Sequence, residues 1–236
     1  MVVRYRDRTD AGQRLATDLV DYAHRPDVVV LALPRGGVPV GFEVAQVLGV
    51  PLDVFVVRKL GLPGYPEFAM GAIASGGVRV LDPEVVRRFG VSAEELAAVT
   101  AIEQRELERR ERRYRVTRPF PDVRDRTVIL VDDGLATGAT MAAATKALRA
   151  EGPSKVVVAV PVSAPDTCDA FRQLADDIVC SETPDPFHAV GLWYDDFTQT
   201  SDDEVHDLLA RAASEHPVVP RARTPAGAPI GRESRA

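Results

Sequence analysis

Two adjacent carboxylates, Asp132 and Asp133, stand between an apolar run at residues 127–131 and a loop rich in Gly, Ala and Thr. A stretch with helical spacing follows the loop. Free backbone N–H groups at a helix start, together with the hydroxyls of Thr137 and Thr140, can bind one phosphate. The glycines of this loop, Gly134 and Gly138, would let the backbone approach the anion closely.

A simpler interpretation is a tight turn between a strand and a helix, with Asp132 and Asp133 as caps. Adjacent carboxylates at a strand end lie where open α/β sheets bind ligands, so a binding site is favoured. The loop has no Lys for a nucleotide-binding P-loop, and the chain has no Gly-x-Gly-x-x-Gly. Both patterns normally carry nucleotide or dinucleotide binding, so those two classes are weakened.

The segment Val131-Asp-Asp-Gly-Leu-Ala-Thr-Gly-Ala-Thr140, preceded by a short apolar strand, resembles the phosphoribosyl-pyrophosphate (PRPP) motif of type I phosphoribosyltransferases. The resemblance implies that the acidic pair binds the ribose 2′- and 3′-hydroxyls and that the following loop binds the 5′-phosphate. The family usually has Glu-Asp, whereas the first acid here is the shorter Asp132. By resemblance the PRPP-binding residues are Asp132, Asp133, Gly134, Ala136, Thr137, Gly138, Ala139 and Thr140.

A second glycine loop, Pro34-Arg-Gly-Gly-Val-Pro-Val-Gly41, follows the apolar run at residues 28–33. It offers flexible backbone, N–H groups before a helix and one cation, which suit a second anion. The resemblance assigns pyrophosphate to this loop, often with an unusual peptide conformation, and makes Arg35, Gly36 and Gly37 the candidates. Taken alone, the loop is more typical of a glycine turn with a solvated Arg35 than of a binding site.

Two cations, Arg58 and Lys59, end the next apolar run and precede a Gly/Pro-rich stretch at residues 61–67. That stretch has little tendency to form helix or strand, which predicts a mobile lid. In the resembling family a flexible loop in this interval closes over PRPP, and its basic residues assist pyrophosphate departure. The alternative is a surface basic pair without a function.

An aromatic cluster at residues 187–197 contains the only Trp. Such clusters can stack a planar ring. In the family a variable hood selects the acceptor, so Trp193, Tyr194 and Asp195 are the acceptor-binding candidates, and core packing is the competing interpretation. His188 has no visible partner, which favours a structural role.

These loops need a scaffold that presents strand ends along one edge. Apolar runs at 28–33, 52–57, 127–131, 155–160 and 177–180 predict strands, and helical spacing at 38–48 and 138–150 lies between them. Alternating strands and helices predict an α/β fold with a central, mainly parallel sheet of five or six strands and flanking helices. The resemblance implies the same fold class.

One segment departs from this alternation. Gly76-Gly77 between two apolar arms at residues 69–81 predicts a hairpin. Asp82-Pro83 and the capping box at 92–95 each predict a helix start, the second helix running to about residue 114. We therefore expect a phosphoribosyltransferase-like domain at 1–215, with a helical insertion at 82–117, a hood at about 185–200, and a disordered tail at 216–236.

Charge and composition narrow the function classes. The 236 residues carry a net charge of −6, and residues 1–215 alone carry −9, which disfavours nucleic acid as a partner. The longest stretch without a charged residue has 12 residues, too short to span a membrane. No secretory signal is visible, which predicts a cytoplasmic protein. Cys168 and Cys180 have neither metal spacing nor a disulfide pattern, so two buried thiols are expected.

The resemblance implies transfer of the 5-phosphoribosyl group of PRPP to a nitrogenous small molecule, with release of pyrophosphate. Mg²⁺, held mainly through PRPP without a dedicated set of protein ligands, and Arg35, Arg58 and Lys59 would stabilise the leaving group. Asp132 and Asp133 would stabilise the ribose cation. The alternative is a regulatory protein that senses PRPP or a nucleotide without efficient transfer. The acceptor is left open by the sequence, and a homodimer is compatible with the family.

Overall fold

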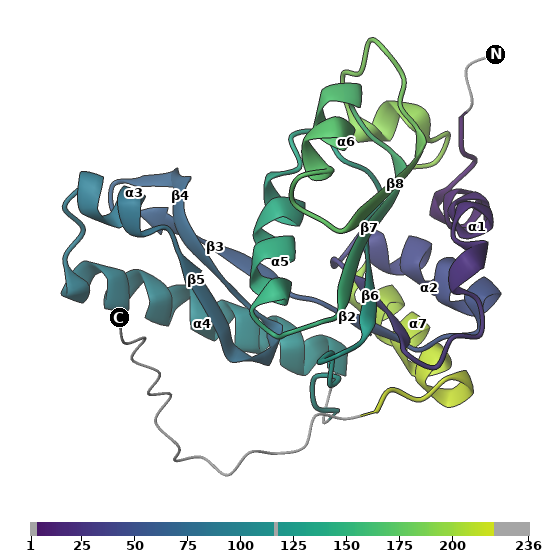
Figure 1. Ribbon diagram of the computed structural model, residues 1–236, viewed down its shortest axis with the longest axis horizontal. Coiled ribbons are helices and arrows are strands. Elements are labelled where there is room, and N and C mark those ends of the chain that lie inside the picture. The colour runs from purple at the N-terminus through teal and green to yellow at the C-terminus, as the bar shows by residue number, and fades with distance from the viewer. Residues whose placement is uncertain (1–3, 116–117, 220–236) are drawn as a thin grey trace.

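The computed structural model describes residues 4–115 and 118–219. A five-stranded sheet runs through its centre in the order β2-β1-β6-β7-β8, and every neighbouring pair in it is parallel (Figure 1). This confirms the predicted fold class. The strands are β1 (Val28–Ala32), β2 (Leu52–Val54), β6 (Thr127–Val131), β7 (Lys155–Val162) and β8 (Asp177–Glu182).

Helices cover both faces of this sheet, which explains why its central strands are apolar without interruption. Along β1, Val28 and Val30 pack into a core with α1, α2 and α7, whereas Val29 and Leu31 face α5 and α6. The alternation follows from the two-residue period of a strand. The helices are α1 (Arg8–Asp18), α2 (Gly37–Leu48), α5 (Ala139–Arg149), α6 (Pro165–Phe171) and α7 (Asp202–Glu215).

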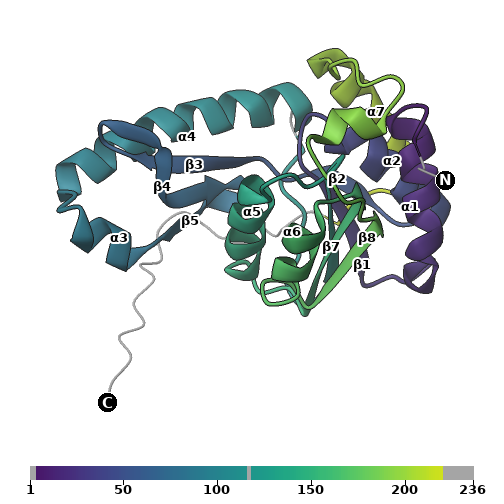
Figure 2. The ribbon, with the colours of Figure 1, turned by 90° about the horizontal axis from the view of Figure 1, so that it is seen from above.

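A second unit, here called the arm (residues 57–115), projects to one side of the central sheet, as Figures 1 and 2 show. It contains an antiparallel sheet in the order β3-β4-β5 and two helices. The predicted hairpin turn at Gly76 and Gly77 is confirmed, and both glycines have positive φ. The arm elements are β3 (Val57–Leu62), β4 (Tyr65–Ala74), β5 (Val78–Leu81), α3 (Pro83–Arg88) and α4 (Ala93–Arg115). A short 3-10 turn lies in the arm at Ser75–Gly77, and two others lie outside it at Val20–Tyr22 and Val190–Trp193.

Both predicted helix starts in the arm are confirmed. The Asp82 carboxylate accepts hydrogen bonds from the N–H groups of Glu84 and Val85, with Pro83 in the first turn. Ser92 and Glu95 form the reciprocal bonds of a capping box before α4. The predicted insertion at 82–117 thus contains α3 and α4, while residues 116–117 lie outside the described part of the chain.

The strand predicted at 52–57 and the lid predicted at 61–67 both need correction. The run at 52–57 is divided, because β2 ends at Val54 and β3 begins at Val57. The stretch at 61–67 is the end of the β3–β4 hairpin and not an irregular lid. A Cβ on Gly61 would lie 2.3 Å from the Pro66 carbonyl oxygen, so the glycine permits close approach of two strands at a register shift.

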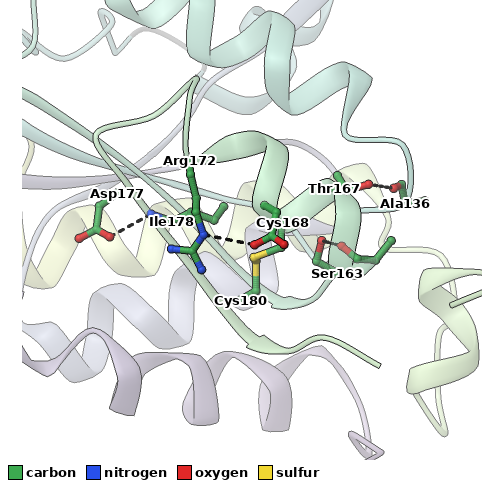
Figure 3. Close-up of a disulfide and its surroundings, with 10 residues drawn as sticks. Ala136, Ser163, Thr167, Cys168, Arg172, Asp177, Ile178 and Cys180 are labelled. Carbon is green, nitrogen blue, oxygen red and sulfur yellow. Dashed lines mark hydrogen bonds and ion pairs between the residues drawn. A yellow bond between two sulfur atoms is a disulfide. The ribbon is translucent and has the colours of Figure 1, made fainter. Parts of the chain in front are cut away.

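The cysteine prediction is also wrong, because Cys168 and Cys180 form a disulfide (Figure 3). Cys168 lies on α6 and Cys180 on β8, and the packing of α6 beside β8 brings their Cα atoms to 6.6 Å. A sequence separation of twelve residues carries no sign of this contact.

The predicted tail at 216–236 lies outside the described residues from position 220 onward.

Candidate active site

The two glycine loops meet at the carboxyl edge of neighbouring strands. β1 and β6 pair in register, with Ala32 opposite Val131, and the Leu33 N–H donates to the Val131 carbonyl at 2.9 Å. The loop after β1 therefore begins beside the acidic pair. The peptide between Pro34 and Arg35 is cis, in keeping with the unusual conformation that the resemblance led us to expect.

Glycine is required where the first loop passes over the acidic pair. A Cβ on Gly36 would lie 2.0 Å from Oδ2 of Asp133, and one on Gly37 would lie 2.8 Å from the Val131 carbonyl oxygen. Separations this short, below about 3 Å, cannot be accommodated without movement. Gly36 and Gly37 thus bring the predicted pyrophosphate loop into direct contact with Asp132 and Asp133.

Each carboxylate of the pair is fixed by one oxygen. Oδ1 of Asp132 accepts the Asp133 N–H at 2.9 Å, and Oδ2 of Asp133 accepts the Arg8 Nε–H at 2.9 Å. No other residue in the described ranges donates a hydrogen bond to Oδ2 of Asp132 or to Oδ1 of Asp133. Asp132 and Asp133 are both only partly buried, so these two oxygens can each accept a hydrogen bond from a ligand.

Burial raises the pKa of both carboxyls, and the neighbouring charges differ in their effect on the two. Burial raises the pKa of Asp132 well above its usual value, and the neighbouring Asp133 charge raises it further. Burial also raises the pKa of Asp133, while the Arg8 guanidinium opposes that rise. The sequence did not reveal this contact of Arg8 with the acidic pair, because Arg8 lies 125 positions away at the start of α1 with no motif around it.

The loop after the acidic pair encloses a cavity of about 170 Å³ at the N-terminus of α5. Gly138 precedes the helix with a φ of 67° and provides no side-chain cap, so N–H groups of the first turn face the cavity region. The cavity is lined by the predicted phosphate-binding residues 136–140, by Val190 of the hood, and by Asp132, Gly134, Leu135 and Met141, whereas Asp133 does not line it.

Helix α6 packs against this loop. The Thr167 hydroxyl donates to the Ala136 carbonyl at 2.7 Å, as Figure 3 shows. A Cβ on Gly138 would lie 2.6 Å from the Phe171 ring, so the glycine also permits close packing. The disulfide at Cys168 joins the same helix to β8. The backbone of the loop at residues 134–138 is therefore held by contacts with α6.

The three predicted cations occupy different surroundings. Arg35 lies 3.8 Å from Asp202 at the start of α7. Arg58 pairs with Glu103 of α4 at 2.6 Å. Lys59 has no ion-pair partner in the described part of the chain.

Arg58 and Lys59 also face opposite sides of the arm sheet, because they are consecutive residues within β3 rather than at a strand end. Lys59 shares its face with Ala72 and Val80, its register partners. Those two residues and Ala139 of α5 line a cavity of about 500 Å³. Ala139 also lines the cavity of about 170 Å³ at the N-terminus of α5. Lys59 is thus the cation on the side of the acidic loop.

The predicted acceptor residues lie in the hood, here residues 185–200. Tyr194 is buried, and its hydroxyl donates to the Asp133 carbonyl at 2.6 Å. The Trp193 ring stacks on Phe187 with centroids 6.4 Å apart, and its buried Nε1 has no hydrogen-bond partner among residues 4–115 and 118–219. Asp195 is exposed and lies 3.4 Å from Arg4. The hood therefore packs onto the acidic loop through Tyr194.

Comparison with known proteins shows the family. Residues 4–196 match the family described as phosphoribosyl transferase domain. The chain belongs to this family. The match spans both glycine loops, the arm and most of the hood, and thereby confirms the resemblance seen in the sequence.

A Mycobacterium tuberculosis (strain H37Rv) protein named "Putative phosphoribosyl transferase Rv0571c" is 52% identical over 206 residues, which cover 87% of this chain and 46% of that protein. The chain thus spans about half the length of this curated relative. The crystal structure of TT1426 from Thermus thermophilus is 44% identical, with a TM-score of 0.80, and the match covers 89% of this chain and 99% of that one.

The described residues contain neither a metal-ligand cluster nor a membrane-spanning helix. No group of three or more His, Cys, Asp or Glu side chains that could hold a metal ion occurs within residues 4–115 and 118–219. No helix in the same ranges is long and apolar enough to cross a membrane.

Proposed function

We propose that the chain transfers the 5-phosphoribosyl group of PRPP to a nitrogenous small molecule and releases pyrophosphate. The observation that carries this proposal is the division of labour within the acidic pair. One oxygen of each carboxylate is held by the protein, the other has no donor among the described residues, and Asp132 lines a cavity at a helix N-terminus. Two adjacent acceptors next to an anion cradle match a ribose diol and its 5′-phosphate.

In this proposal the open oxygens of Asp132 and Asp133 accept hydrogen bonds from the ribose 2′- and 3′-hydroxyls. Backbone N–H groups and hydroxyls of residues 136–140 hold the 5′-phosphate. Arg35 and the backbone of Gly36 and Gly37 bind the pyrophosphate, since this loop lies directly against Asp133.

The reaction is an attack of the acceptor nitrogen on C1 of the ribose as pyrophosphate leaves. Negative charge grows on the leaving group, so nearby cations accelerate its departure. Lys59 is placed best for this role, because it faces the α5 side and has no ion-pair partner within the described ranges. Arg58 stays in the proposal as a second cation, although it pairs with Glu103.

The developing positive charge on the ribose would be stabilised by the carboxylates. Asp133 is suited to this because Arg8 opposes the rise in its pKa that burial causes. Mg²⁺, held mainly through the oxygens of PRPP itself, would supply further charge neutralisation at the pyrophosphate.

For the acceptor, Trp193, Tyr194 and Asp195 remain our candidates. Tyr194 would act from beneath, through its bond to the Asp133 carbonyl. The exposed Asp195 is free to bind a polar edge of a ring if it leaves Arg4. We keep the cytoplasm as the compartment and a homodimer as the assembly, both as proposals.

The test is a panel of purine, pyrimidine and non-nucleobase acceptors incubated with PRPP, Mg²⁺ and the full chain, with pyrophosphate release as the readout. We expect release with at least one acceptor and none from the Asp133→Asn variant. PRPP binding without release with any acceptor would favour the regulatory alternative. Absence of PRPP binding would reject both functions.

A further inference from the structure

Arg8 connects the beginning of the chain to the acidic pair. Its Nε lies 2.9 Å from Oδ2 of Asp133, and its side chain is only 11% exposed. Charged side chains are rarely buried to this extent without a partner. The proposed reaction uses the charge of Arg8 but assigns no role to the geometry of this contact.

The guanidinium is held by two further contacts, both with the hood. Nη1 donates to the Thr198 carbonyl at 2.8 Å, and Cζ lies 4.0 Å from the centre of the Phe197 ring. A planar group bonded at two edges and stacked on one face has little freedom to rotate. A flexible ammonium could not satisfy all three contacts.

Space around the contact is equally restricted. A Cβ on Gly36 would lie 3.3 Å from the Arg8 Nε and 2.0 Å from Oδ2 of Asp133. Helix α1, the pyrophosphate loop, the acidic pair and the hood therefore meet at one carboxylate. Arg8 and Gly36 contact this carboxylate directly, and the hood acts on it through Arg8.

We propose that Arg8 is a positioning residue for PRPP binding: it holds one oxygen of the ionised Asp133 carboxylate so that the other oxygen is directed to the ribose. This inference rests on the proposed function. It also assigns Phe197 and Thr198 a purpose, because they hold the guanidinium in the orientation that Asp133 requires.

The charge balance around Asp133 supports this role. The titratable groups that face it are Arg8 of α1, its neighbour Asp132, and Tyr194 of the hood. Burial raises the pKa of Asp133, and Arg8 is the cation that lowers it. Removing Arg8 should raise that pKa further, so less of the carboxylate is ionised at any given pH below the new value.

A purely structural role for Arg8 makes a different prediction. If the residue served only to attach α1 to the hood, its removal would lower stability without changing how Asp133 titrates. The ionisation of Asp133 therefore separates the two explanations.

The first experiment uses no ligand. The carboxyl carbons of Asp are labelled with ¹³C in the full chain, the Asp133 signal is assigned with Asp133→Asn, and pH titrations follow in wild type, Arg8→Met and Arg8→Lys. We expect the Asp133 midpoint to rise by about one pH unit or more in Arg8→Met. In Arg8→Lys, which keeps the charge, we expect the midpoint to stay close to the wild-type value.

Arg6→Met is the matched control, since the Arg6 side chain is 74% exposed and pairs with Asp10 near the start of α1. We expect it to leave the midpoint unchanged. An unchanged midpoint in Arg8→Met, or an equal shift in Arg6→Met, overturns the inference. If Arg8→Met fails to fold, Arg8→Gln provides the neutral side chain for the same comparison.

The second experiment titrates PRPP with Mg²⁺ into the same variants by calorimetry across a range of pH. Arg8→Met should bind about tenfold more weakly at acidic pH, for a midpoint shift of one unit, and should approach wild-type affinity at alkaline pH. An equal loss at every pH contradicts the inference. If wild type itself fails to bind PRPP, the proposed function is wrong, and the ligand-free titration still decides whether Arg8 controls Asp133.

Discussion

The acidic loop (residues 132–140) and the arm (residues 57–115) are held by the rest of the chain in different ways. Around the loop, Arg8, Gly36, Thr167 and Tyr194 make contact from four separate segments. In the arm, α3 has no buried residue, and α4 buries three of its 23. The loop is therefore preorganised by its surroundings, whereas the arm keeps much of its surface in solvent.

The difference indicates a division of tasks within the proposed reaction. The acidic loop needs fixed geometry, because hydroxyls and a phosphate are bound at set positions. The arm carries Lys59, whose role depends on where the arm lies relative to α5. Three large apolar side chains of the arm, Tyr65, Phe68 and Phe89, are exposed. Substitutions in one of these regions should therefore leave the task of the other intact.

The attachment of the arm gives the largest expected effect. Arg115, at the end of α4, donates to Asp53 at 3.0 Å, to Ser75 at 3.2 Å and to the Val54 carbonyl, and the side chains of Arg115 and Asp53 are each only 5% exposed. Arg115→Met leaves Asp53 buried without its partner, so we expect a loss of about 3–5 kcal/mol in the free energy of unfolding. Urea denaturation measures it.

Arg112→Met is the control for that experiment. Arg112 lies on the same helix, pairs with Glu108 and is 69% exposed, so its removal should change stability by less than about 1 kcal/mol. Equal effects from both variants would mean that Arg115 does not secure the junction between arm and central sheet.

The two cations of β3 give the next effect. Lys59→Ala should lower the rate of pyrophosphate release by about tenfold or more while PRPP affinity changes little, because the interaction strengthens as charge builds on the leaving group. Arg58→Ala should lower that rate by less, and should also cost at most about 1 kcal/mol of stability through loss of the Glu103 pair. Steady-state kinetics and thermal melting separate the two.

Arg79→Ala serves as the matched control, because Arg79 is exposed and lies on the Arg58 side of the same sheet. It should leave kcat unchanged. Should Lys59→Ala turn over at the wild-type rate, the arm would have no part in leaving-group departure.

The contact between the two glycine loops gives a smaller effect on stability. Gly36→Ala inserts a Cβ 2.0 Å from Oδ2 of Asp133, which must move, so we expect weaker PRPP binding and a loss of about 1–3 kcal/mol in stability. Gly152→Ala provides the comparison. Its nearest neighbour would lie 3.8 Å away, and its φ of 78° costs about 1 kcal/mol without touching the site. Matching PRPP affinities in the two variants would contradict the loop contact.

The sequence predicted the central sheet and both glycine loops because their signals are local. An uninterrupted apolar run such as residues 127–131 is required by a strand covered on both faces, and it is visible without knowledge of its neighbours. The acidic pair follows that run directly. Its position at the carboxyl edge was therefore predictable together with the fold.

The remainder depends on contacts between distant residues. The pairing of Arg8 with Asp133, and of Cys168 with Cys180, arises only when α1 and α6 pack in their places. The Gly/Pro-rich composition of residues 61–67 predicted a mobile lid, whereas Gly61 in the structure allows close approach of the Pro66 backbone. Consecutive cations at 58 and 59 gave no indication that a strand would direct them to opposite faces.

The central claim is that PRPP binds at the acidic loop, and calorimetric titration of PRPP with Mg²⁺ tests it most directly. Asp133→Asn and Thr137→Ala should each weaken binding by about 1–3 kcal/mol, since each removes a hydrogen bond to the ligand. Asp169→Asn, which changes an exposed carboxylate paired with Arg172, should bind as wild type does. Wild-type affinity in both Asp133→Asn and Thr137→Ala would contradict the account.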